Sequence, residues 1–122
     1  MSAIEQTPGT EKLILACSGS ADVGSIADRV ARSLARDGEG MMSCLSALNG
    51  RIPEIIRMAK RAKKILAIDG CPNECTAKCL KKAGVDNFEH LRLEDLDFEK
   101  WKCPESNENI ASAAAIGSEL LA

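Results

Sequence analysis

Aromatic and histidine side chains are scarce in this sequence. It contains no tyrosine, and its three aromatic residues, Phe88, Phe98 and Trp101, all follow residue 87. Proteins that bind single-stranded nucleic acids stack bases on aromatic side chains, and most of this chain has no ring to offer. Because His90 is the single histidine, the HExxH metalloprotease motif and histidine-rich metal sites are excluded.

Long apolar segments and an excess of one charge are also missing. No segment approaches the roughly 18 apolar residues of a transmembrane helix, and the start of the chain lacks the apolar stretch of a signal peptide. With 16 Lys and Arg against 18 Asp and Glu, the net charge of -2 gives no electrostatic reason for binding duplex DNA or an anionic membrane. We therefore expect a cytoplasmic protein without a nucleic-acid or membrane partner, and the sequence points to no particular protein partner.

What the chain does contain is six cysteines, namely Cys17, Cys44, Cys71, Cys75, Cys79 and Cys103. Six in 122 residues is fewer than in a disulfide-stabilised scaffold, and a chain of this length can build a core without disulfides. In the reducing cytoplasm, cysteines indicate metal binding, redox or nucleophilic chemistry, or plain core packing.

Hydrophobic patterning predicts alternating strands and helices. Short apolar runs at residues 12–17, 40–48 and 65–68 are typical of buried strands, and the charged segment 88–93 suits an edge strand. Apolar residues at helical spacing predict four helices, at about residues 20–37, 52–62, 72–83 and 108–121. Ser20 or Asp22 can cap the first helix, Pro53 suits the first position of the second, and Ile52 is expected on that helix's apolar face.

This order of elements predicts a single α/β domain of the Rossmann-like class. A mainly parallel four-stranded sheet would be covered by helices on both faces, giving three layers, and a C-terminal helix would follow. Residues 1–11 are expected to form a flexible N-terminal lead. Residues 12–98 would be the α/β cysteine-cluster domain, and residues 99–122 a tail with a short helix.

Four of the cysteines are expected to meet at one edge of the sheet. Cys17 ends the first predicted strand, Cys44 lies late in the second, Cys71 follows the third, and Cys75 lies one turn into the next helix. Ligands of open parallel sheets bind beyond the carboxyl ends of the strands, so thiols from three segments would gather there. Each cysteine alone could be a small buried hydrophobic residue. Together they favour a thiolate site, which zinc, iron–sulfur clusters and copper(I) all accept.

Helix geometry separates the three cysteines that follow the third strand. Residues four apart rise about 6 Å along a helix and residues eight apart about 12 Å, so Cys71 and Cys79 cannot both reach one ion. We pair Cys71 with Cys75, next to the sheet edge, and expect Cys79 to pack with Leu80 and Ala83. A helix beginning at Cys71 would also favour the thiolate forms of Cys71 and Cys75.

Other polar residues are expected to have structural roles. Asp69 would cap the third helix, His90 would lie on the surface of the edge strand, and Cys103 has no visible partner. The loop after Cys17 is similar to the anion-binding loop of cysteine phosphatases. Their Cx5R pattern requires an arginine where Val23 stands, so that reaction class is disfavoured.

The cysteine-bearing segments resemble the DGC-domain family. The matching residues are Cys17-Ser18-Gly19, Ala21-Asp22-Val23-Gly24, Met42-Ser43-Cys44 and Ile68-Asp69-Gly70-Cys71-Pro72 with Cys75. The triplet Asp69-Gly70-Cys71 is the motif that names the family, and the resemblance spans about residues 12–94. It implies a zinc-binding protein whose metal ligands are Cys17, Cys44, Cys71 and Cys75. Cys79 departs from the family pattern.

The sequence thus predicts a zinc-binding protein, with an iron–sulfur cluster or another soft metal as the alternative cofactor. Two other functions stay open: a thiol-redox or cysteine-nucleophile enzyme using Cys71 or Cys17, and a metal-delivery or scaffold protein. Serine substitution of any of the four implied ligands is expected to lower zinc occupancy. Cys79→Ala and Cys103→Ser are expected to leave it unchanged.

Overall fold

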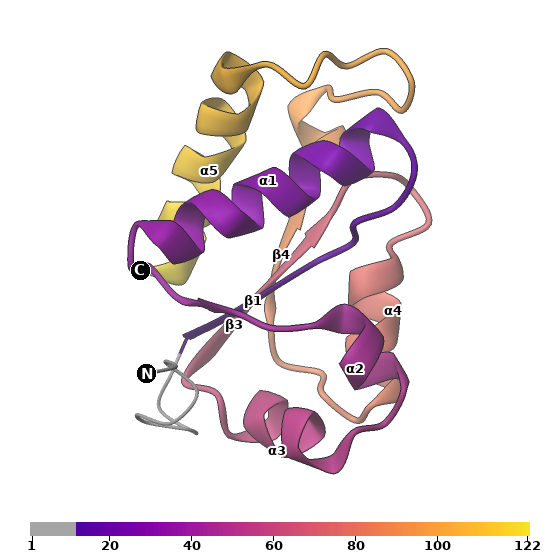
Figure 1. The fold of residues 1–122 in the computed structure, drawn as a ribbon, viewed down its shortest axis with the longest axis vertical. Helices are drawn as coiled ribbons and strands as arrows, with labels where there is room; N and C mark the ends of the chain where they lie inside the picture. Colours follow the sequence, from indigo (N-terminus) through magenta and orange to yellow (C-terminus); the bar gives the residue numbers. More distant parts are fainter. Residues whose placement is uncertain (1–11) are drawn as a thin grey trace.

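Four parallel strands form one sheet at the centre of the described part of the chain (Figure 1). The computed structural model describes residues 12–122, so the lead predicted at residues 1–11 lies outside the described residues. The strands are β1 Lys12–Ala16, β2 Met41–Met42, β3 Lys64–Asp69 and β4 Glu89–Arg92. Their order in the sheet is β2-β1-β3-β4, which puts β4 at an edge, as predicted.

Helices cover both faces of this sheet. One face carries α1 Asp22–Arg36 and α5 Asn107–Leu121, and the other carries α2 Leu45–Asn49, α3 Pro53–Arg61 and α4 Cys75–Lys82. A short 3-10 helix, η2 Leu93–Leu96, follows β4. The arrangement confirms the predicted three-layer α/β fold with a parallel four-stranded sheet and a C-terminal helix.

The two central strands are apolar along their length because both of their faces are buried. Ile14 and Leu66 pack in the cluster with α1 and α5, whereas their neighbours Leu13 and Ile65 pack in the cluster with α2, α3 and α4. Successive side chains of a strand point to opposite faces, so a strand between two helical layers needs apolar residues at every position. The continuous runs seen in the sequence follow from this.

The second predicted strand, residues 40–48, is wrong beyond its first residues. Within this run only Met41 and Met42, the residues of β2, pair with β1, and the backbone turns into α2 at Leu45. The sulfur of Cys44, the residue before this helix, accepts a hydrogen bond from the backbone N–H of Ala47 at 3.4 Å. Leu45 and Leu48 then present one helical face to the core. Cys44 is therefore a helix cap and not a strand residue, because a short apolar run fits either kind of element.

The helix after β3 begins later than predicted, at Cys75 instead of near Pro72. Glu74 has a left-handed backbone conformation, with φ 53° and ψ 47°, which an α-helix cannot include. The turn before it is closed by the N–H of Glu74, which donates to the carbonyl oxygen of Cys71 at 3.2 Å. Cys71 thus lies in a turn ahead of the helix and not at the predicted helix start.

The expected cap of α1 is also wrong. The N-cap position is taken by Ala21, whose side chain has no acceptor, and Asp22 is already the first helical residue. One carboxylate oxygen of Asp22 accepts the backbone N–H of Val23 at 2.8 Å. The same carboxylate also accepts hydrogen bonds from a segment far along the chain.

That segment is the strap, residues 97–105, which crosses the start of α1. The carboxylate of Asp22 accepts the backbone N–H of Trp101 at 2.6 Å and that of Cys103 at 2.8 Å. Trp101 has a left-handed backbone with φ 69° and an exposed side chain, so these hydrogen bonds hold a strained turn in place. Burial alone would raise the pKa of Asp22, but the N–H donors outweigh it and hold the pKa below its usual value.

We predict that Asp22→Asn lowers the free energy of unfolding at neutral pH and that the loss shrinks in acid. A carboxyl whose pKa is lowered by folding stabilises the folded state above its unfolded pKa, and this stabilisation disappears as the pH falls through the folded pKa, below about pH 4. Urea unfolding at neutral and acidic pH measures the difference. Asp37→Asn, at the exposed end of α1, is the control. An equal loss at both pH values would contradict the assignment.

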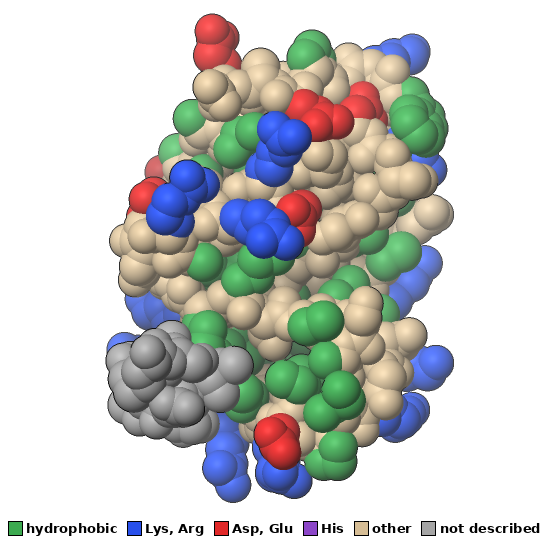
Figure 2. Space-filling view, in the orientation of Figure 1, with side chains coloured by type: hydrophobic (Ala, Val, Ile, Leu, Met, Phe, Trp, Pro, Cys, Tyr) green, Lys and Arg blue, Asp and Glu red, His purple; other side chains and the backbone are tan. Residues whose placement is uncertain are grey.

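The face shown in Figure 2 has interspersed basic and acidic side chains over α1 and apolar side chains gathered over α2 and α3. On α1, the guanidinium of Arg32 pairs with Asp28 at 2.8 Å. Ile52, expected on a buried helical face, is instead 48% exposed, because it precedes the helix that begins at Pro53. Within residues 12–122, no helix combines the length and apolar character needed to cross a membrane.

Candidate thiol site

The carboxyl ends of β1 and β3 lie side by side at a point where the chain leaves the sheet toward opposite faces. β1 leads to α1 on one face, and β3 leads to α4 on the other. Ligands of doubly wound α/β sheets bind at such a switch point. A pocket of about 180 Å³ lies there, and its walls include Cys17 and Gly19 after β1, Gly70 and Cys71 after β3, and Cys75 of α4.

Three of the four predicted ligands therefore share this switch-point pocket. Cys17 and Cys71 are half-buried, and Cys75 is exposed. The backbone N–H of Cys17 donates to the carbonyl oxygen of Ile68 at 3.1 Å, and the hydroxyl of Thr76 donates to the same oxygen at 3.1 Å. The end of β1 and the start of α4 are thus fastened to one carbonyl group of β3, which places Cys17 and Cys75 next to each other.

The electrostatic surroundings of Cys17 favour its neutral form. Burial raises the pKa of its thiol above the usual value, and the neighbouring Cys75 thiol and Asp69 carboxylate raise it further. The backbone N–H of Gly19 opposes this rise without cancelling it. A cation entering the pocket would reverse the balance, because positive charge stabilises the thiolate.

The pocket does not hold a preformed metal cage. Among residues 12–122, no three Cys, His, Asp or Glu side chains lie close enough together to hold a metal ion. The thiols of Cys17, Cys71 and Cys75 share a pocket, but their three sulfur atoms do not converge closely enough to bind one ion. The donor types and the location suit a thiophilic metal, and the side-chain positions would have to change on binding.

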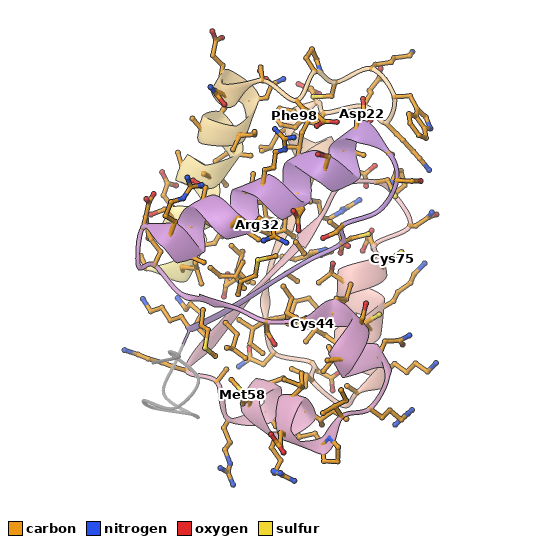
Figure 3. All side chains as sticks on the ribbon, in the orientation of Figure 1. Asp22, Arg32, Cys44, Met58, Cys75 and Phe98 are labelled. Atoms are coloured by element: carbon orange, nitrogen blue, oxygen red, sulfur yellow. The ribbon has the colours of Figure 1, made fainter. Side chains whose placement is uncertain are left out.

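Cys44 lies in a neighbouring cavity instead of the switch-point pocket. Its side chain is exposed before α2, whereas Cys75 begins α4 (Figure 3). The cavity that Cys44 lines has a volume of about 480 Å³, and its walls also include Asp28 and Arg32 of α1. Gly19 lines both hollows, so they adjoin along the loop after β1.

The remaining two cysteines are packing residues. Cys79 lies half-buried against the cluster under α4, as predicted, and burial raises the pKa of its thiol, with Cys75 and Asp69 adding to the rise. Cys103, for which the sequence offered no partner, is buried in the cluster with α1 and α5. Its sulfur accepts a hydrogen bond from the side-chain amide of Asn109 at 3.6 Å.

Asp69 lies beneath the site and joins three segments. One carboxylate oxygen accepts the N–H of Thr76 at 2.8 Å, and the other accepts the N–H of Ala77 at 3.1 Å, so the predicted capping role is confirmed. The second oxygen also pairs with Nε2 of His90 at 2.8 Å. His90 was expected on the surface, but its side chain is only 21% exposed. The parallel pairing of β3 with β4, which no sequence pattern indicated, brings His90 to this carboxylate.

Lys100 is a site residue that the sequence pattern did not reveal. It belongs to the strap and lines the switch-point pocket together with the three thiols. The pocket cysteine nearest to Lys100 in the sequence is Cys75, about 25 positions away. No local spacing in the sequence therefore linked Lys100 to the site. The strap reaches the pocket because Asp22 holds it at the start of α1.

Comparison with known proteins identifies the family of this chain. A family model described as the DGC domain matches residues 13–116. The curated protein "Anaerobic and virulence modulator AnvM" of Pseudomonas aeruginosa is 36% identical over 88 residues, which cover 72% of this chain and 67% of that protein. No solved structure shows a significant match. The match includes the Asp69-Gly70-Cys71 triplet and most of the described fold, and the chain belongs to the DGC-domain family.

Proposed function

We propose that this protein binds a zinc ion through the thiolates of Cys17, Cys71 and Cys75. The observation that supports the proposal best is their shared pocket at the switch point of the sheet, where α/β folds bind ligands. Thiolate sulfur is a preferred ligand of zinc in proteins. The resemblance of the cysteine-bearing segments to a family described as zinc-binding favours zinc over other thiophilic metals.

Zinc binding requires the three sulfurs to approach one ion to about 2.3 Å. A cysteine side chain has a single heavy-atom torsion, so rotation between staggered rotamers moves the sulfur while the backbone stays in place. Cys71 lies in the turn after β3, outside both the strand and α4, so rotation of its side chain leaves the sheet and the helix in place. Cysteine binds a metal as the thiolate, so Cys17 would lose its proton on coordination. The charge of the metal would offset the effect of burial, which raises the pKa of this thiol.

Three thiolates leave one position of a zinc tetrahedron open. Cys44, the fourth ligand implied by the family resemblance, lies in the adjoining cavity and caps α2. A fourth thiolate would close the site in the manner of structural zinc, whereas water in that position would allow Lewis-acid chemistry. We propose that Cys44 contributes less to zinc affinity than the three thiols of the switch-point pocket.

We predict one zinc ion per chain when the protein is purified without chelator, as measured by native mass spectrometry with elemental analysis. Cys17→Ser and Cys75→Ser should lose most of this zinc, and Cys44→Ser should retain more of it. Cys79→Ser is the matched control, because Cys79 lies one turn further along the same helix and should not affect occupancy. Amide spectra of each variant would show that it is folded.

Two results would contradict the proposal. Zinc occupancy unchanged in both Cys17→Ser and Cys75→Ser would remove the switch-point pocket as the site. Stoichiometric iron with inorganic sulfide would indicate a cluster instead of zinc. A second readout is alkylation of Cys71, which should be slower in the zinc-loaded protein than after chelation, because a coordinated thiolate is not free to react.

A further inference from the structure

We propose that Cys17 and Cys75 form a reversible disulfide by exchange with a low-molecular-weight disulfide, and that this oxidation takes two donors away from the zinc site. The inference rests on the proposed zinc binding only in its consequence for the metal. The pairing itself follows from the contacts around the two thiols. The thiol pocket would then be a redox-regulated site and not only a metal site.

The backbone holds these two thiols together. The N–H of Cys17 and the hydroxyl of Thr76, the residue after Cys75, both donate to the carbonyl oxygen of Ile68. The carboxylate of Asp69 fixes the start of α4 to the same strand end through two more N–H groups. Both thiols line the same pocket. The two cysteines are 58 positions apart in sequence, so only the tertiary fold brings them together.

The other pairings are disfavoured by geometry. Cβ atoms four residues apart on a helix are about 5–6 Å apart, whereas a disulfide requires about 3.5–4.5 Å, so Cys75 and Cys79 cannot join within an intact α4. Cys44 lies in the adjoining cavity, and Cys103 is buried in the cluster with α1 and α5. Cys71 shares the pocket, but the residues hydrogen-bonded to the carbonyl oxygen of Ile68 are Cys17 and Thr76, the neighbour of Cys75.

Exposure decides the order of the two exchange steps. The exposed Cys75 loses its proton to solvent, and its thiolate attacks one sulfur of the external disulfide, which forms a mixed disulfide and releases one small thiol. The half-buried Cys17 then gives up its proton and attacks the Cys75 sulfur, which forms the internal disulfide and releases the second small thiol. The two cysteines are oxidised, and the small disulfide is reduced to two thiols. An excess of small thiol runs the same steps backwards.

The test uses the full chain, reduced and freed of metal, with hydroxyethyl disulfide as the oxidant. We expect digestion to yield a peptide containing Cys17 joined to one containing Cys75, with the loss of two hydrogen atoms from that pair. Cleavage after Glu74 separates Cys71 from Cys75, and cleavage after Lys78 separates Cys75 from Cys79, so each pairing gives a distinct mass. An internal disulfide that joins any other pair would overturn the assignment.

Single variants test the order of attack. Cys17→Ser should stop at the first step and accumulate the mixed disulfide on Cys75. Cys75→Ser should form no internal disulfide and carry no adduct on Cys17, because Cys17 is half-buried. The control Cys79→Ser should form the Cys17–Cys75 disulfide as the parent protein does. An adduct on Cys17 in Cys75→Ser, at the rate seen for Cys75, would overturn the proposed order.

The last part of the test uses zinc-loaded protein. It distinguishes a failure of the redox inference from a failure of the proposed function. In the zinc-loaded protein, disulfide formation should be slower, and oxidation should release the metal to a chromogenic chelator. Zinc binding without a Cys17–Cys75 disulfide in the metal-free chain would refute the redox inference alone. A Cys17–Cys75 disulfide in a chain that does not bind zinc would refute the proposed function and leave the thiol pairing established.

Discussion

Gly70→Ala is expected to destabilise the folded protein by about 3 kcal/mol, the upper part of the usual range for overpacking a close-packed interior. A Cβ atom at this position would lie 2.4 Å from the carbonyl oxygen and 2.6 Å from the carbonyl carbon of Val23. Both are backbone atoms in the first turn of α1, so the clash cannot be relieved by rotating a side chain. The turn after β3 would have to move away from α1, which also deforms the thiol pocket.

Urea unfolding of Gly70→Ala against Gly19→Ala measures this effect. Gly19 lines the same pocket, but the nearest atom that its added Cβ would meet is the sulfur of Cys17 at 3.6 Å, an ordinary contact. We expect Gly19→Ala to stay within about 0.5 kcal/mol of the parent protein, as substitutions without a specific conflict do. Similar stability of the two variants would show that the turn and α1 are not locked together.

Asp69→Ala is expected to cost about 3 kcal/mol, because it removes a buried charged acceptor from several donors at once. The carboxylate is 2% exposed and accepts the N–H groups of Thr76 and Ala77 and a hydrogen bond from His90. Without it, the start of α4 has two buried donors without an acceptor, and Cys75 loses the anchor that fixes its position.

Urea unfolding compares Asp69→Ala with Asp86→Ala, which changes an exposed carboxylate in the loop before β4. Asp69→Asn should lie between them, because its amide oxygen can still accept one hydrogen bond. The ring N–H signal of His90 in NMR spectra should move in Asp69→Ala and stay in place in Asp86→Ala. Equal stability of Asp69→Ala and Asp86→Ala would show that this network contributes little.

The Asp-Gly-Cys triplet acquires a distinct physical role at each position. Asp69 caps α4 and pairs with His90, Gly70 allows the turn to touch the backbone of α1, and Cys71 faces the pocket. These roles depend on one another, because the close approach at Gly70 brings the end of β3 to the loop that carries Cys17. The motif therefore builds the switch point as well as one wall of the thiol pocket.

Tertiary structure alone decided which cysteines share a pocket. Cys44 was placed in a strand, but it caps α2, since a short apolar run is compatible with a strand or a helix and only packing decides between them. The left-handed Glu74 puts the start of α4 at Cys75 instead of near Pro72, and no spacing in the sequence reports a backbone dihedral angle. The contact of His90 with Asp69 and the place of Lys100 in the pocket likewise join segments far apart in the chain.

The amino-acid sequence by itself determined the order of the four strands and of the four longer helices, the parallel sheet and the edge at which thiols gather. Those features follow from local patterns, because a strand buried on both faces must be apolar at every position, and a parallel strand brings its carboxyl end to the same edge as its neighbours. The pairing of Cys17 with Cys75 depends instead on hydrogen bonds to the carbonyl oxygen of Ile68. Contacts of that kind form only when β1, β3 and α4 have packed, so they leave no periodic trace in the sequence.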